Sequence, residues 1–263
     1  MTELDWAMLR SVRTLTETDE YLVLDKPAGV SVTGERHETD LVRIAKEAGE
    51  VLIPVHRIDK VTSGVVLLAK TQAAHGPLTR QFALRGVRKA YLAITRSVGL
   101  PPSGTVELPL SVGRKNRVRV GAPREDITFD EEAARWWVPK DSVRARSYPS
   151  LTAFTQVWHG ERNTLLAVCP ETGRRHQIRV HLAWIGHPIA GDPLFPSAQG
   201  TPADPAVRTC LHAWRLSFDD LDGQRVTVTA APEESFWSPV ADELPPGERA
   251  EALRRLGATA AAE

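Results

Sequence analysis

The sequence has little cysteine and no long apolar run. Only Cys169 and Cys210 occur among its 263 residues, without a Cys-x-x-Cys spacing, which argues against a disulfide framework and against a cysteine zinc site. No stretch approaches the ~20 apolar residues of a membrane helix, and the N-terminus lacks the apolar segment of a signal peptide. We therefore expect a cytoplasmic protein with no membrane partner.

Glycine-rich phosphate loops are also missing. The sequence contains no G-x-G-x-x-G after a strand, no Walker pattern and no G-x-S-x-G nucleophile turn. We therefore expect no cofactor and in particular no nucleotide cofactor. The length is enough to bury a hydrophobic core without a metal or disulfide, and we expect one domain over residues 1–263, acting as a monomer.

Net charge is zero, but the charges are unevenly distributed. Residues 80–124 hold ten basic side chains and a single acid, Glu107, whereas residues 217–263 hold ten acids and four arginines. Such a bias predicts a basic face for a polyanion and an acidic C-terminal end. The alternative is that the basic side chains point to several different faces.

Apolar patterning favours strands over helices. Strands are expected at residues 21–25, 62–70, 89–95, 106–112, 118–120, 152–158, 164–168, 211–218 and 224–230. Helices are expected at residues 39–47, 71–84, 176–184 and 248–256, and residues 121–149 read as an irregular excursion. The predicted class is α+β, with a mixed, mostly antiparallel central sheet and flanking helices.

Asp59 lies in the densest polar cluster, VHRIDKVTSG at residues 55–64, directly before a buried strand. Neighbouring His56, Arg57 and Lys60 favour an ionised carboxylate, which can serve as a nucleophile or a base. The alternative is a structural ion pair or a turn cap. Residues two apart in an extended segment share a side, so Arg57 and Asp59 are expected together while Ile58 turns into the core.

A second cluster precedes and enters the helix expected at residues 176–184. It contains Arg174, Arg175, His176, Gln177, Arg179 and His181. Arginines beside helix amides predict an anion site. A metal site built from His176, His181, His187 and Asp192 is the weaker reading, because the spacing is not that of a helical zinc pair.

Lys89 and Tyr91 form a third cluster on the strand expected at residues 89–95. Tyrosine in a strand is usually a half-buried packing residue. Beside a basic run, its ring can also stack on a nucleobase.

Together these segments resemble the RluA-type pseudouridine synthases, which isomerise uridine in ribosomal or transfer RNA. The resemblance covers residues 21–218, through YLVLDKPAGVSV, HRIDKVTSGVVLLAKT, RKAYLAI, TGRRHQIRVHLAWIGHPIAGDPLF and LHAWRLSF, in the family's order. Only about twenty residues precede the first motif, so we expect no N-terminal S4 domain.

The resemblance implies roles for individual residues. Asp59 would be the catalytic carboxylate, Tyr91 would stack on the flipped uracil, and Arg179 would pair with Asp59, with Ile178 in the pocket wall. Arg57 would occupy the space left by the extracted base. RNA contacts are expected from Arg57, His56, Lys89, Arg174, Arg175, His176 and Gln177. The family needs no metal or cofactor.

Two other functions remain open from the residues. One is a catalytically silent RNA-binding protein on the same fold, which would have no need of a carboxylate facing phosphates. The other is a metal-dependent hydrolase using His176, His181 and Asp192. The sequence does not identify the RNA, the uridine or the number of sites.

Overall fold

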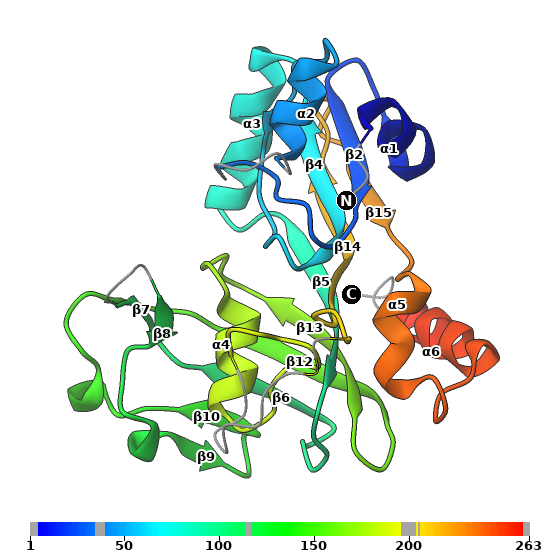
Figure 1. Cartoon of the computed structure of the whole chain (residues 1–263). Helices are drawn as coiled ribbons and strands as arrows, with labels where there is room; N and C mark the ends of the chain where they lie inside the picture. The colour runs from blue at the N-terminus through cyan, green and yellow to red at the C-terminus, as the bar shows by residue number, and fades with distance from the viewer. Residues whose placement is uncertain (1–4, 35–39, 114–116, 196–203, 205, 260–263) are drawn as a thin grey trace. The chain divides into compact units, whose positions relative to one another are not determined.

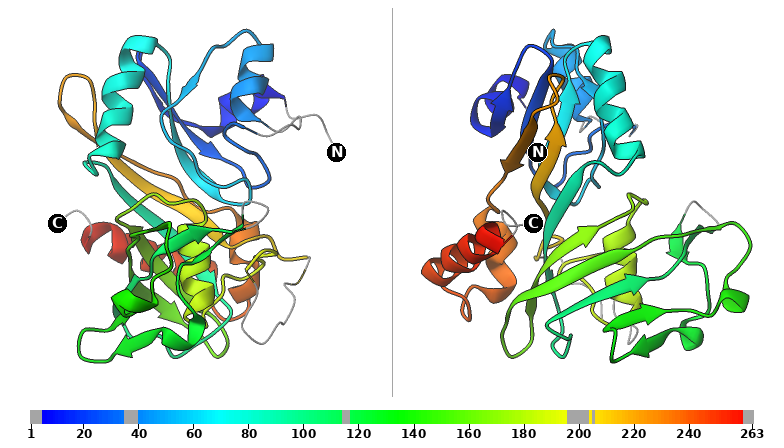
Figure 2. Two further views of the ribbon diagram at one scale, coloured as in Figure 1. Left: turned by 90° about the vertical axis from the view of Figure 1, so that its left-hand side faces the viewer. Right: turned by 180° about the vertical axis from the view of Figure 1, so that it is seen from behind.

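The computed structural model describes residues 5–34, 40–113, 117–195, 204 and 206–259. The chain divides into two units (Figures 1 and 2). The first consists of Met1–Tyr91 and Leu211–Pro232, and the second of Leu92–Cys210 and Glu233–Glu263. Strand β5 (Arg88–Thr95) runs from the first unit into the second. The expectation of a single catalytic domain stays a prediction.

The first unit is built on a sheet whose strands follow the order β1-β2-β4-β14. These strands are β1 (Thr14–Glu17), β2 (Tyr21–Lys26), β4 (Ser63–Ala69) and β14 (Leu211–Asp219). Short β3 (Ile53–Pro54) pairs with β4, and β15 (Arg225–Thr229) pairs with β14. Only β4 and β14 run parallel among the pairs described for this unit.

Both faces of strand β4 are buried, which explains its unbroken apolar sequence. Val66 and Leu68 pack with helices α1 (Trp6–Arg13) and α2 (Leu41–Glu47). Val65, Leu67 and Ala69 point to the other face, against helix α3 (Gln72–Ala83). The period-two alternation of a strand therefore divides the hydrophobic residues of this unit into two clusters.

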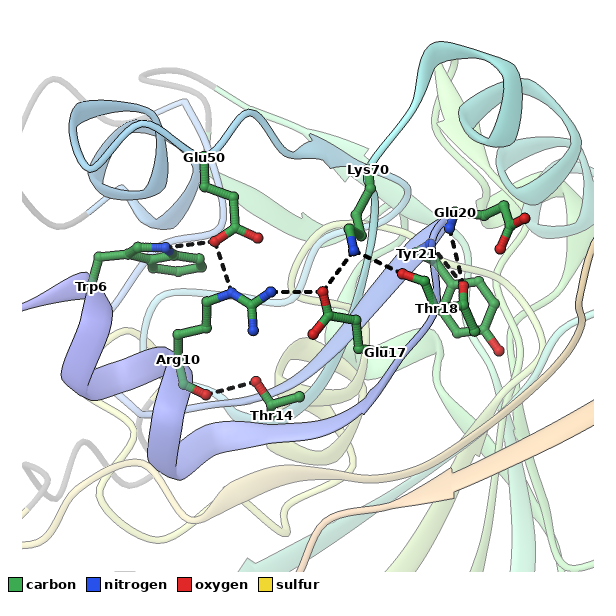
Figure 3. A network of polar contacts seen from close by, with 9 residues as sticks. All are labelled: Trp6, Arg10, Thr14, Glu17, Thr18, Glu20, Tyr21, Glu50 and Lys70. Carbon is green, nitrogen blue, oxygen red and sulfur yellow. Dashed lines mark hydrogen bonds and ion pairs between the residues drawn. The ribbon is translucent and has the colours of Figure 1, made fainter.

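Helix α1 is attached by a network of polar side chains (Figure 3). Arg10 donates to Glu50 at 2.8 Å and to Glu17 at 2.7 Å, and Lys70 donates to the same Glu17 at 2.7 Å. The Trp6 indole donates to Glu50 at 2.8 Å, while its ring is buried in the core. The two cations lower the pKa of Glu17 below its ordinary value. The network thus connects α1, β1 and the end of β4.

The second unit contains a sheet with the strand order β13-β12-β6-β10-β9. Its strands are β6 (Ser103–Glu107), β9 (Thr128–Asp130), β10 (Arg135–Trp137), β12 (Thr152–His159) and β13 (Thr164–Pro170). Strand β10 is parallel to β6, and the other described pairs are antiparallel. A small sheet has the order β11-β7-β8, with β7 (Leu110–Val112), β8 (Val118–Val120) and β11 (Ser147–Tyr148).

Helix α4 (Gln177–Trp184) is buried along almost its whole length in the second unit. Near the C-terminus lie α5 (Glu234–Trp237) and α6 (Pro246–Thr259). Single 3-10 turns occur at Arg124–Asp126, Lys140–Ser142 and Ser238–Val240. No helix among the residues placed by the structure is long and apolar enough to cross a bilayer.

The predicted α+β class with mixed, mostly antiparallel pairing is confirmed. Two details were wrong. The strand expected at residues 106–112 is two strands in different sheets, since the chain leaves β6 at Glu107 and enters β7 at Leu110. The excursion at 121–149 includes β9 and β10, and Trp136 in β10 is buried, stacked on Phe129 at 4.3 Å between ring centroids.

Candidate active site

Asp59 lies in a tight turn that leads directly into β4. The amide of Thr62 donates to the Asp59 carbonyl at 3.0 Å, and Ile58 before it is buried in the core, as expected. The carbonyl of the next residue, Lys60, accepts from the amide of Gly29 at 2.8 Å. The turn that bears the carboxylate is therefore held against the Lys-Pro-Ala-Gly segment at residues 26–29.

Lys26 connects the same two turns from inside. Its ammonium is fully buried and donates to the carbonyls of Pro27, at 2.8 Å, and Val30, and at 3.5 Å to that of Lys60. A buried ammonium is costly unless it is hydrogen-bonded. These backbone acceptors supply the bonds and fix the local geometry beside Asp59.

The Thr-Ser-Gly segment anchors the other side of the turn. Ser63 donates to Nδ1 of His212 at 2.8 Å, and Nε2 of His212 donates to the carbonyl of Ala230 at 2.9 Å. Gly64 has a φ of +109°, and a Cβ there would lie 2.2 Å from the carbonyl oxygen of Ala213. Only glycine fits where β4 and β14 approach so closely.

Tyr91 and Asp59 lie close enough in the first unit to interact electrostatically. Burial and the negative charge of Asp59 both raise the pKa of the Tyr91 phenol, so the hydroxyl stays protonated. The ring is half-buried against the cluster that contains Ile58 and Leu24. Of the three residues predicted to be catalytic, Asp59 and Tyr91 belong to the first unit and Arg179 to the second.

His56 has a structural role within the first unit. Its Nε2 accepts from the amide of Leu67 at 3.0 Å, and its ring is stacked on Phe82 with centroids 4.7 Å apart. Burial and nearby Lys89 lower its pKa to about 3, so it is neutral at physiological pH. Because Nε2 accepts this bond, the proton of the neutral ring lies on Nδ1. The predicted RNA contact of His56 stays a prediction.

Arg57 is exposed, and Lys89 is partly buried. The Arg57 Nη1 lies 3.8 Å from the position that a Cβ would take at Gly34, so the guanidinium lies beside this glycine. Burial and the charge of Arg85 lower the pKa of Lys89. Lys89 and Tyr91 are two residues apart on β5 and so lie on the same side of the strand.

In the second unit, Arg179 on α4 is held by Asp192. Its Nε donates to one carboxylate oxygen at 2.6 Å and its Nη2 to the other at 2.9 Å, with both side chains buried. Asp192 also accepts from the amides of Leu194 and Phe195. The carboxylate thus orients the guanidinium in the two-point geometry favoured by arginine. The predicted pairing of Arg179 with Asp59 stays a prediction.

Gln177 is buried at the first turn of α4, which corrects its predicted RNA contact. Its carbonyl oxygen accepts from the Thr172 hydroxyl at 2.6 Å and from the Arg174 amide. Its amide nitrogen donates to the Leu151 carbonyl and the Thr152 hydroxyl. The amide group is engaged within the unit, and we do not propose it as an RNA contact.

His181 continues this buried network. Its Nε2 is 2.9 Å from the Leu108 carbonyl, which can only accept, so Nε2 carries the proton, and Nδ1 accepts from Thr152 at 2.9 Å. These contacts use both ring nitrogens in structural bonds. No group of three or more His, Cys, Asp or Glu side chains within the described ranges is arranged to hold a metal ion.

The acid sensitivity of folding should depend on His181. Burial lowers its pKa from 6.5 to about 4, so the unfolded chain binds this proton more readily than the folded one. The contribution of neutral His181 to the free energy of unfolding is complete above pH 6.5 and is lost as the pH falls toward 4. The loss is about 2 kcal/mol at pH 5. Urea unfolding of His181→Gln should show a shallower decline in stability between pH 7 and 5 than the native chain. The exposed His159→Gln serves as control; a slope unchanged by His181→Gln would contradict the assignment.

Arg174, Arg175 and His176 precede α4. Both arginines are exposed, whereas His176 is partly buried, has a φ of +57° and contacts the edge of Phe195. Of the ten basic residues in the 80–124 span, Arg114 and Lys115 lie outside the described residues, and the others are divided between the two units. The common basic face therefore stays a prediction.

Comparison with known proteins identifies the family of this chain. Residues 20–184 match the model of the RNA pseudouridylate synthase family. The chain belongs to this family, whose members are isomerases, and the enzyme class predicted from the sequence is thereby confirmed.

Relatives of this chain reach 33–34% identity. The dual-specificity RNA pseudouridine synthase RluA of Escherichia coli K12 is 33% identical over 77% of this chain and 84% of its own length. The ribosomal large subunit pseudouridine synthase D of Nitrosomonas europaea is 34% identical over 84% of this chain, which spans 62% of that relative. The human RNA pseudouridylate synthase domain containing 4 has a similar fold, with a TM-score of 0.72 at 24% identity over 89% of this chain and 94% of the human chain.

Proposed function

We propose that this chain converts uridines in structured ribosomal or transfer RNA to pseudouridine, with Asp59 as the catalytic carboxylate. The observation that supports this most directly is the placement of Asp59 in a turn held by backbone hydrogen bonds, where its charge acts on the half-buried Tyr91. Membership of the RNA pseudouridylate synthase family supports the same reaction. Action as a cytoplasmic monomer remains part of the proposal.

The reaction breaks the N1–C1′ glycosidic bond and joins C5 of the same uracil to C1′. N1 gains a proton, and C5 loses the hydrogen that the new bond replaces. Glycoside hydrolysis uses two carboxylates and a water, whereas this isomerisation must exclude water and keep the base. One carboxylate suffices, whether Asp59 attacks C1′ or removes a proton from C2′.

The other residues assist this step in the proposed mechanism. The target must be flipped out of folded RNA, at a cost of a few kcal/mol. Tyr91 holds the flipped uracil by stacking, worth roughly 1–3 kcal/mol. Asp192 orients the buried guanidinium of Arg179 in the second unit, and Arg57 fills the space left by the base.

Release of tritium tests the proposed reaction. RNA transcribed with uridine labelled at C5 loses its label only when C5 forms a new bond. Incubation of the purified chain with labelled ribosomal or transfer RNA should release tritium to water, and sequencing should locate pseudouridine at discrete positions. Binding of these RNAs without any release would favour the catalytically silent alternative.

Arg57→Ala should slow single-turnover conversion far more on a folded stem-loop than on an unfolded strand with the same target. A residue that replaces the flipped base matters most where stacking must be broken, and the exposed Arg57 is available for this. The comparison needs an RNA that is modified in both forms, and Arg162→Ala, exposed in the second unit, is the control. An equal loss on both substrates would leave Arg57 as a simple phosphate contact.

A further inference from the structure

Tyr148 exposes a large aromatic side chain at the edge of the small sheet. It lies in β11, which pairs only with β7 in that sheet, and 52% of its surface is accessible. Its partner in the strand register, Leu110, and the next residue across, Val120, are buried. The Tyr148 side chain is therefore exposed to solvent, whereas Leu110 and Val120, its neighbours across the strands, are buried.

An arginine lies over this ring. The guanidinium of Arg174, on the loop before α4, is 5.4 Å from the Tyr148 ring centroid. Arg174 is itself exposed, and its amide donates to buried Gln177, which fixes the backbone of the loop. Two segments distant in sequence therefore meet to form an aromatic and cationic pair at the surface.

The surroundings of the pair are basic. Arg144 and Arg146 precede Tyr148 in the chain, and Arg175 follows Arg174; all are exposed. The Arg144 amide donates to the Gly121 carbonyl at 2.7 Å, and its carbonyl accepts from Ser147 at 2.8 Å, which holds this loop beside the end of β8. Residues 141–150 and 171–176 contain four arginines against two acids, Asp141 and Glu171.

We propose that Tyr148 and Arg174, with Arg144, Arg146 and Arg175, form a platform on which an unpaired nucleotide of the substrate RNA stacks. This rests on the proposed function, since it takes RNA as the substrate, and it assigns a role to the excursion at residues 121–149. Unpaired bases stack on aromatic rings and on guanidinium planes. The arginines provide the charge complementarity for the adjoining phosphates.

The experiment uses the full chain with Asp59→Asn, so that binding is measured without turnover. The probes are a fluorescent oligouridylate of about a dozen nucleotides and an RNA duplex of equal length. Adding Tyr148→Ala to the Asp59→Asn variant should weaken its binding of the single strand at least about fivefold. This corresponds to about 1 kcal/mol, the low end of the free energy of base stacking. It should leave duplex binding unchanged, because paired bases present no open face.

Matched variants separate stacking from charge. Tyr148→Phe should restore binding, since the ring is sufficient. Arg174→Ala should lower the slope of log affinity against log salt by about 0.7 for each phosphate that the guanidinium neutralises, whereas Tyr148→Ala should leave that slope unchanged. Arg162→Ala, which changes a charge elsewhere in the second unit, is the control.

The outcomes distinguish this platform from the proposed reaction. If Tyr148→Ala binds the single strand as well as its parent, or no worse than Arg162→Ala, the Arg174–Tyr148 contact is only structural and the platform is overturned. Tritium release by the chain with native Asp59 would then still uphold the reaction. If the chain neither binds RNA nor releases tritium, both proposals are overturned.

Discussion

Replacing Asp59 with asparagine is expected to abolish pseudouridine formation while the protein still folds and binds RNA. Asparagine has nearly the same shape but is neither a nucleophile nor a base at neutral pH. The backbone bonds from Thr62 to the Asp59 carbonyl and from Gly29 to the Lys60 carbonyl do not involve the carboxylate. We expect the rate of tritium release to fall by more than roughly a hundredfold, within the range for loss of a catalytic base.

Asp222→Asn is the matched control, because Asp222 is an exposed aspartate in the same unit. It should retain the full rate. Retention of even a hundredth of the native rate by Asp59→Asn would reject the assigned role, provided that its thermal unfolding matches that of the native chain.

Replacing Asp192 with alanine is expected to destabilise the second unit severely. Arg179 would lose two charge-assisted hydrogen bonds in a buried site, and the amides of Leu194 and Phe195 would lose their acceptor. Removing one partner of a buried ion pair typically costs about 3–5 kcal/mol. Urea unfolding of Asp192→Ala should show a loss of this order, whereas the exposed Asp242→Ala should be nearly neutral.

A double variant separates the charge from the loss of packing. Arg179→Met combined with Asp192→Leu removes both charges and keeps apolar volume, so it should be less destabilised than Asp192→Ala alone. Its isomerase activity should still be low, since Arg179 is one of the residues predicted to be catalytic. Equal stability of the native chain and Asp192→Ala would show that the pair contributes little to folding.

The sequence predicts elements best where burial leaves a regular pattern. The strand expected at 62–70 is found at Ser63–Ala69, because both of its faces are buried. Helix α1 was missed, although Asp5 accepts from the amides of Ala7 and Met8 as an N-cap and Trp6 and Leu9 enter the core. The sequence does carry a signal for this helix: an aspartate that can act as an N-cap, followed by apolar residues three positions apart.

The candidate site was predictable in its residues but not in its tertiary contacts. Motifs identified Asp59 and Tyr91, and the negative charge of Asp59 contributes to the raised pKa of the Tyr91 phenol. The partnership of Arg179 and Asp192 joins residues thirteen apart, and local patterns do not specify it. His56 and Gln177 are polar, and their enclosure depends on partners supplied by distant backbone and side chains, such as the Leu67 amide and Thr152.

The path of the chain between the two units has a consequence for synthesis on the ribosome. The chain leaves the first unit after Tyr91, returns at Leu211 and leaves again after Pro232. Strand β14, which pairs with β4 and β15, belongs to that returning segment. While residues 92–210 are being translated, β4 therefore lacks this neighbour. The first unit is expected to close only after its last segment emerges, so a nascent chain stalled before β14 should remain sensitive to protease in its N-terminal part.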